Sequence, residues 1–182
     1  MKVYKPTKYR TKDGRELLIR EATVEDAAAI LEHVEHISGE SDFLTVGPGK
    51  FEPTVAQEEE YLRDSQQSDN KLYIIALVDN DLVGALSFSA GSRTRVRHSG
   101  ELAMSVRKSH WGLGLGSRLL EALIGWAKDG HIVKKINLRV RTDNQRAIQL
   151  YKGQGFVMEG LITKAIFMDD HYYDFFWMGL EL

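Results

Sequence analysis

Three glycines alternate with other residues in the stretch Val106-Arg107-Lys108-Ser109-His110-Trp111-Gly112-Leu113-Gly114-Leu115-Gly116-Ser117-Arg118-Leu119-Leu120. Residues 100–106, just upstream, are expected to form a strand. Downstream, residues 115–128 repeat apolar side chains at about the spacing of an amphipathic helix. The stretch is therefore predicted to be a strand, a glycine-rich turn and the start of a helix.

The alternating glycines indicate an anion-binding turn. Because Gly112, Gly114 and Gly116 lack side chains, their backbone N–H groups can approach a ligand closely and point the same way. A helix N-terminus adds roughly half a positive charge, and its unpaired amides suit a phosphate or pyrophosphate. The alternative is a flexible linker, which is disfavoured because a linker needs no apolar helix starting on its last glycine.

The composition is typical of one globular domain. The chain has 182 residues, a formal net charge of −2 and no cysteine, so it contains no disulfide, thiolate metal site or cysteine nucleophile. The small net charge gives no indication of a nucleic-acid or membrane partner, and no stretch approaches a membrane span in length. We expect an N-terminal arm over residues 1–16, one domain over residues 17–182 and a cytoplasmic location.

The remaining patterns predict a mixed arrangement of strands and helices. Strands are expected at 17–20, 71–78, 82–90, 134–141, 156–168 and 172–182, and helices at 23–37, 54–65 and 144–151. The long loop over residues 38–53 carries Phe43 and Leu44, which need cover, so it is a candidate wall for a substrate. His33 and His36 lie three residues apart on a helix, a spacing that suits a metal, but no third ligand is evident and surface histidines are the preferred interpretation.

A dinucleotide site is the first alternative for the glycine turn. Such sites belong to doubly wound domains that repeat strand and helix, with an acidic residue about 20 positions further on. This sequence predicts only one such crossover, flanked by hairpins, and position 132 is Ile132. The context therefore argues against a dinucleotide.

A second element narrows the interpretation: Asn144-Gln145-Arg146-Ala147-Ile148-Gln149-Leu150-Tyr151-Lys152-Gly153-Gln154-Gly155-Phe156. It fits the pattern Asn-x-x-Ala-x-x-Leu-Tyr-x-x-x-Gly-Phe, and it follows a turn similar to the signature Gln/Arg-x-x-Gly-x-Gly/Ala. Together the two elements resemble the GCN5-related N-acetyltransferase (GNAT) superfamily over about residues 17–182. The resemblance implies an α/β fold with a mixed, mostly antiparallel sheet of about seven strands, flanking helices and a central splayed parallel pair at 100–106 and 134–141.

The resemblance also implies acetyl-CoA as the cosubstrate, bound between the splayed strands. Its pantetheine would pair with the backbone near Met104, Ser105 and Val106, and the side chain of Asn144 would contact the cofactor. Its pyrophosphate would lie on the amides of Gly112, Leu113, Gly114, Leu115, Gly116 and Ser117. One departure is Trp111, which stands where the signature has Gln or Arg, so the backbone amides are expected to hold the phosphates without help from that side chain.

The activity implied is direct transfer of acetyl to a primary amine in a ternary complex. Glu101 is the candidate base, and the alternative is a strand glutamate paired with Arg93, Arg95 or Arg97. Tyr151 is the candidate acid, and the alternative is a core tyrosine. Arg139 stands where enzymes resembling the ribosomal alanine acetyltransferases often carry a glutamate base, which argues against that subgroup. A non-catalytic acyl-CoA-binding module is the rival function, and the acceptor amine and a homodimer are both left open.

Overall fold

The computed structural model describes residues 4–45, 47, 49 and 53–182. In this part of the chain eight strands form a sheet of order β1-β2-β3-β4-β5-β6-β8-β7. The strands are β1 (Thr7–Arg10), β2 (Glu16–Glu21), β3 (Lys71–Val78), β4 (Asp81–Ala90), β5 (Ser99–Val106), β6 (Lys135–Arg141), β7 (Val157–Met168) and β8 (His171–Glu181). The helices are α1 (Ala27–Ser38), α2 (Val55–Gln67), α3 (Leu115–Gly130) and α4 (Gln145–Gly153).

The sheet has the predicted character. Every neighbouring pair of strands is antiparallel except β5 and β6, which are parallel. The eighth strand is β1, which lies within residues 1–16, the segment expected to be an arm. It pairs with β2 from Thr7 opposite Ile19 to Arg10 opposite Glu16, so this part of the segment extends the edge of the sheet.

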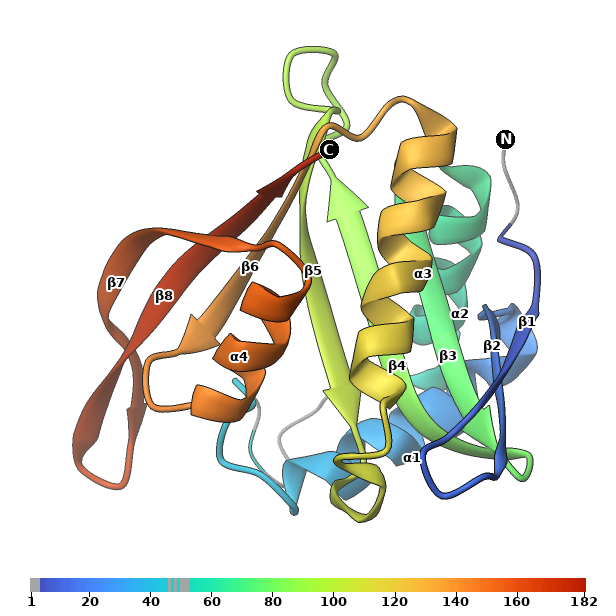
Figure 1. Ribbon diagram of the computed structural model, residues 1–182, viewed down its shortest axis with the longest axis horizontal. Coiled ribbons are helices and arrows are strands. Elements are labelled where there is room, and N and C mark those ends of the chain that lie inside the picture. The colour runs from blue at the N-terminus through green and yellow to red at the C-terminus, as the bar shows by residue number, and fades with distance from the viewer. Residues whose placement is uncertain (1–3, 46, 48, 50–52) are drawn as a thin grey trace.

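Helices cover both faces of the sheet (Figure 1). On one face α3 buries Leu119, Leu120 and Trp126 against a core that includes Phe88, and α4 joins the same core. On the other face α1 and α2 pack a second core, which includes Leu62. Strand side chains make up much of both cores, and the apolar face of α3 has the helical spacing that the sequence predicted. No helix in the described ranges is long and apolar enough to cross a membrane.

The parallel pair separates soon after it forms. Strands β5 and β6 pair only at Ser99 with Lys135, Gly100 with Ile136 and Glu101 with Asn137. Beyond these residues β5 stays paired with β4 alone, and β6 with β8 alone. The divergence leaves the last residues of β5 with a free backbone edge. A cavity of about 700 Å³ lies at this opening, a volume typical of small-molecule sites.

Candidate active site

The glycine turn forms one end of the cavity, and its glycines are required for different reasons. Gly112 and Gly114 have φ of +81° and +93°, in the left-handed region that favours glycine. Gly114 directly precedes α3, and no atom lies within 4 Å of where its Cβ would be. Gly116 allows close packing, since a Cβ there would lie 2.8 Å from Leu150 Cδ2 on α4. The turn therefore leaves open space in front of the first amides of α3.

Two side chains from different elements stack beside this turn. Trp111 Nε1 donates a hydrogen bond of 2.7 Å to the carbonyl oxygen of Val106, which fixes the indole. The guanidinium carbon of Arg146, on α4, lies 4.9 Å from the centre of the indole ring, and both residues line the cavity. We expected the amides to act without a side chain at position 111, but Arg146 places a positive charge beside them.

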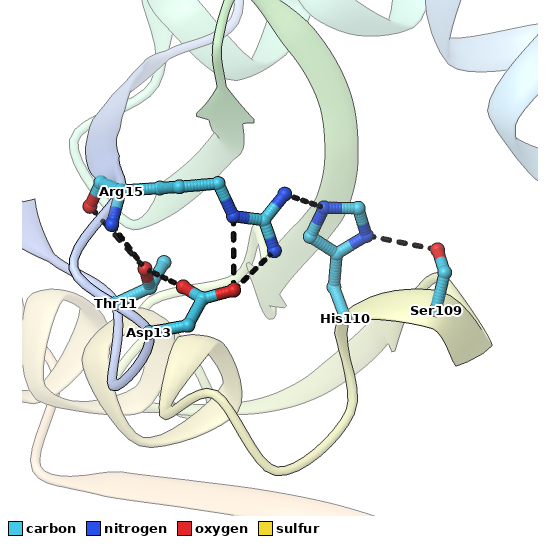
Figure 2. Close-up of polar contacts among 5 residues, drawn as sticks. All are labelled: Thr11, Asp13, Arg15, Ser109 and His110. Carbon is cyan, nitrogen blue, oxygen red and sulfur yellow. Dashed lines mark hydrogen bonds and ion pairs between the residues drawn. The ribbon is translucent and has the colours of Figure 1, made fainter.

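The turn between β1 and β2 is fastened to the segment that precedes the glycines (Figure 2). The backbone N–H of Lys12 donates to the carbonyl oxygen of Leu113 at 3.1 Å. Arg15 Nη1 donates to His110 Nε2 at 3.2 Å, and His110 Nδ1 lies 2.9 Å from Ser109 Oγ. Asp13 holds Arg15 by an ion pair of 2.8 Å.

The direction of these hydrogen bonds shows that Ser109 is not an activated nucleophile. Arginine has no acceptor atom, so His110 Nε2 accepts from Arg15 and the ring proton is on Nδ1. His110 therefore donates to Ser109 and takes no proton from it. Burial, with the nearby charge of Arg15, lowers the pKa of His110, which keeps the ring neutral. The arrangement is a structural clip that places Lys12 at the cavity wall.

The free edge of β5 has side chains on both faces of the sheet. Met104 points toward α3, because its Cε would lie 3.6 Å from a Cβ at Gly116. Ser105 points the other way, and its Oγ lies 3.0 Å from Nε2 of His33 on α1. Both residues and Val106 line the cavity, so the predicted pantetheine edge is accessible from it.

His33 corrects one interpretation of the sequence. We expected His33 and His36 to be surface residues, and this is wrong for His33, whose exposed fraction is 0%. Burial lowers its pKa to about 4, so the ring is neutral at neutral pH. His36 is exposed and pairs with Glu40 at 3.1 Å. Within the described residues no group of three histidine or acidic side chains could hold a metal ion.

The loop after α1 is anchored at the other end of the cavity by Arg141 of β6. The Arg141 side chain, 7% exposed, donates to Asp143 from Nε at 2.7 Å and Nη2 at 2.8 Å, and to the carbonyl oxygen of Asp42 from Nη1 at 2.7 Å. Its guanidinium lies between the rings of Phe43, at 4.5 Å, and Tyr173, at 4.2 Å. Positions 46, 48 and 50–52 of the loop lie outside the described residues.

Glu101 lies on the same face of the sheet as Arg141, in an ion pair with Arg139. Arg139 Nε lies 2.5 Å from Glu101 Oε1, and the two side chains are 50% and 35% exposed. The alternative partners expected for Glu101 were Arg93, Arg95 and Arg97. The structure pairs Arg97 with Asp69 instead, at 2.7 Å. Glu101 and Arg139 both line the cavity, so this ion pair lies at the cavity wall.

Tyr151 and Asn144 lie at the two ends of α4. Tyr151 is 7% exposed and its ring meets Phe156 edge to face at 5.8 Å between centres. Burial raises the pKa of Tyr151 to about 12, so the phenol keeps its proton at neutral pH. Asn144 Oδ1 accepts a 3.2 Å hydrogen bond from the N–H of Ala147, which caps the helix. Both residues line the cavity.

The structure brings nearly all of the predicted site residues to one cavity. Its lining includes Phe43, Leu44, Glu101, Met104, Ser105, Val106, Gly112, Gly114, Leu115, Gly116, Ser117, Asn144 and Tyr151. Leu113 is the exception, since its side chain packs against the core and it contributes its carbonyl to the clip with Lys12. Four basic residues that the sequence did not indicate also line the cavity: Lys12, Arg139, Arg141 and Arg146. Only Arg146 had a local signal, because it lies inside the Asn144–Phe156 element.

Comparison with known proteins agrees with this geometry. The family model described as "Acetyltransferase (GNAT) family" matches residues 40–156, more than half of the chain. The chain is 30% identical over 106 residues to the L-amino acid N-acetyltransferase AaaT of Escherichia coli. That match covers 58% of this chain and 65% of AaaT, slightly less than two thirds of the relative. The chain is also 28% identical over 130 residues to the ribosomal-protein-serine acetyltransferase of Escherichia coli. That match covers 67% of this chain and 71% of the relative.

Solved structures extend the likeness over the whole domain. A GNAT acetyltransferase from Streptococcus pneumoniae superposes with a TM-score of 0.89 at 35% identity, covering 91% of this chain and 99% of that one. YncA from Salmonella typhimurium, solved with its cofactor acetyl-CoA, shares the fold with a TM-score of 0.79 at 22% identity, covering 91% and 94%. The chain therefore belongs to the GNAT acetyltransferase family, whose members use acetyl-CoA.

Proposed function

We propose that the protein is an N-acetyltransferase that moves an acetyl group from acetyl-CoA to a primary amine in a ternary complex. The observation that carries the proposal is that one cavity joins the glycine turn to Glu101 and Tyr151. A cofactor held at the turn and along β5 would reach the two residues able to exchange protons. The family relationship supports the same assignment.

The residues present fit acetyl-CoA. The turn leaves open space at Gly114, where a side chain would stand, and the first amides of α3 would hold the pyrophosphate. Two cations, Lys12 and Arg146, line this end of the cavity and match the negative charge. The free edge of β5 offers backbone partners to the amides of the pantetheine arm. When bound, acetyl-CoA supplies the acetyl group as a thioester that is activated toward attack by an amine.

Glu101 is proposed as the base. An ammonium group must lose a proton before its nitrogen can attack, and Glu101 places a carboxylate at the cavity wall. Its ion pair with Arg139 is half exposed, and exposed pairs contribute only about 0–1 kcal/mol. An incoming ammonium can therefore take the place of Arg139 at the carboxylate at little cost.

Tyr151 is proposed as the acid. The phenol is protonated at working pH, so a proton is available as negative charge develops on the sulfur. Burial raises its pKa, which makes it a weaker acid than a free tyrosine, so the role rests on its position in the cavity. In the balanced transfer the nitrogen–carbon bond forms and the carbon–sulfur bond breaks. Two protons leave an ammonium acceptor: Glu101 takes one before the attack, releases it to solvent, and takes the other as the amide forms. Tyr151 gives a proton to sulfur and is reprotonated from solvent, so one proton is released overall.

Phe43 and Leu44 are proposed to form part of the acceptor wall. Both line the cavity at the end opposite the glycine turn, and Phe43 is held there by Arg141. The two Escherichia coli relatives described above are named for different acceptors, an L-amino acid and a ribosomal-protein serine. A primary amine is the feature that these acceptors share.

The experiment that tests the proposal measures release of free thiol from acetyl-CoA by the purified protein with a panel of amines. Release above the rate of hydrolysis with any acceptor supports the enzyme. Binding of acetyl-CoA without turnover across a broad panel would instead indicate the rival function, a non-catalytic acyl-CoA-binding module. Calorimetry of acetyl-CoA binding separates that outcome from a protein that binds no acyl-CoA at all.

A further inference from the structure

Glu101 and Arg139 present unused hydrogen-bonding atoms to the acceptor end of the cavity. The contact between them joins one nitrogen, Nε, to one oxygen, Oε1. Across the described residues, no hydrogen-bond partner is found for Nη1 and Nη2 of Arg139 or for Oε2 of Glu101. The pair therefore offers two donors from a guanidinium and one acceptor from a carboxylate, side by side.

Arg141, the neighbouring arginine on the same face of β6, is not available in this way. Each of its three nitrogens already donates, to Asp143 or to the carbonyl oxygen of Asp42, and its side chain is buried between two rings. Arg139 is half exposed. Of the two cavity-lining arginines of β6, Arg139 is thus the one with a free fork.

A ligand with an ammonium and a carboxylate close together matches this pair. The planar fork of an arginine binds a carboxylate through two parallel hydrogen bonds, and a carboxylate accepts hydrogen bonds from an ammonium. An α-amino acid carries both groups on a single carbon. Its binding exchanges one half-exposed ion pair for two, and neither Glu101 nor Arg139 is left without a partner.

We propose that the acceptor is a free α-amino acid, whose carboxylate binds Arg139 while its amino group lies at Glu101. The proposal rests on the function proposed above and specifies its substrate class. Phe43 and Leu44 line the same end of the cavity, so they offer an apolar surface to an apolar side chain of the amino acid. A polyamine has no carboxylate for Arg139, and a protein N-terminus has a neutral amide in its place.

The test compares acceptors that differ only in the carboxylate. L-leucine and L-phenylalanine are each measured against their amides, with spermidine and a peptide with N-terminal serine alongside, by thiol release from acetyl-CoA. The α-amino group of an amino-acid amide has a pKa near 8, lower than that of the free amino acid. At neutral pH a larger fraction of the amide is therefore present as free amine, which by itself favours the amide as acceptor. We expect kcat/KM to be at least tenfold higher for the amino acids despite this.

Substitution of Arg139 then identifies the source of the preference. In Arg139→Met the KM for L-leucine should rise at least tenfold, while kcat/KM for leucinamide stays within threefold of wild type or increases. Arg139→Lys keeps the charge but loses the fork, so it should recover part of the affinity. Arg95→Met is the matched control, because Arg95 is an exposed arginine outside the cavity, and it should behave as wild type with every acceptor.

Two results would overturn the inference while leaving the proposed function in place. One is turnover of amides, spermidine or the peptide at rates equal to or above those of the amino acids. The other is an equal loss with L-leucine and leucinamide in Arg139→Met, which would indicate a structural role. Absence of turnover with every acceptor, in a protein that binds acetyl-CoA, would overturn the proposed function and this inference with it.

Discussion

The two ends of the cavity differ in how their charges are balanced. At the glycine turn, Lys12 and Arg146 have no carboxylate partner among the described residues, and backbone amides add to their positive potential. At the other end, Arg139 and Arg141 are each paired with an acidic side chain. An end that lacks its counter-ions suits a highly charged anion, whereas an end that contains both signs suits a ligand that is itself neutral overall or zwitterionic. The difference supports the proposal that the glycine turn binds the cofactor and that the other end binds the acceptor.

The largest expected effect is at Tyr151, where the two ends meet. Tyr151→Phe removes one hydroxyl and little volume, so acetyl-CoA affinity should hold within a few-fold while turnover falls roughly 100-fold, as for loss of a general acid. The measurement compares acetyl-CoA with a thioester that has a more acidic leaving thiol. The defect should shrink with the better leaving group. An equal defect with both thioesters would reassign Tyr151 to packing.

The next effect concerns His33, which supports Ser105 on the wall between the ends. Its pKa of about 4 in the folded protein is below the ordinary value of 6.5, so the unfolded chain binds more protons between these pH values. The free energy of unfolding therefore falls as the pH falls through this window. Between pH 7 and pH 5 the loss is about 2 kcal/mol, equivalent to a roughly thirtyfold change in the folding equilibrium constant.

The measurement for His33 is urea unfolding of the wild type and His33→Gln at the two pH values. The variant lacks the ionisable ring, so its stability should fall by less between pH 7 and pH 5, whatever its stability at pH 7. Equal losses in the two proteins would show that His33 does not contribute to acid sensitivity.

Gly114→Val tests the glycine turn alone. A β-branched residue at a φ of +93° is strained, and its side chain would enter the open space in front of α3. Calorimetry should show acetyl-CoA affinity reduced at least tenfold, about 1.4 kcal/mol. Gly125→Val is the control, because Gly125 lies on α3 outside the cavity and has equal room for a side chain. Unchanged affinity in a folded Gly114→Val protein would place the phosphates elsewhere.

The smallest effect is expected at Arg146. Its side chain is exposed, so its contact with a phosphate would be screened by water, and Arg146→Met should weaken acetyl-CoA binding by about threefold. The difference in acetyl-CoA affinity between Arg146→Met and the wild type should disappear at high salt, because screening removes the electrostatic contribution of Arg146 in the wild type. A loss that is independent of salt would indicate that Arg146 acts by packing on Trp111.

The same contrast explains what the sequence could predict. The glycine turn and the Asn144–Phe156 element are each one unbroken stretch of sequence. Their helices, caps and predicted cavity-lining residues therefore follow from local patterns. Lys12 and Arg139 approach the site only through strand pairing and the β1–β2 turn, which have no local signal. The burial of His33 was predictable, because Ile30, His33 and Ile37 share one face of α1 while His36 does not.

The most direct test of the division between the two ends measures Glu101→Gln and Gly114→Val side by side, each for acetyl-CoA affinity and for turnover with an amine acceptor. Glu101→Gln should bind acetyl-CoA as the wild type does, lose roughly 100-fold in turnover at neutral pH, and recover partly at high pH, where free amine is abundant. In Gly114→Val the main loss should be in affinity for acetyl-CoA. A Glu101→Gln protein whose acetyl-CoA affinity falls as far as that of Gly114→Val, or whose turnover loss is the same at every pH, would contradict the account.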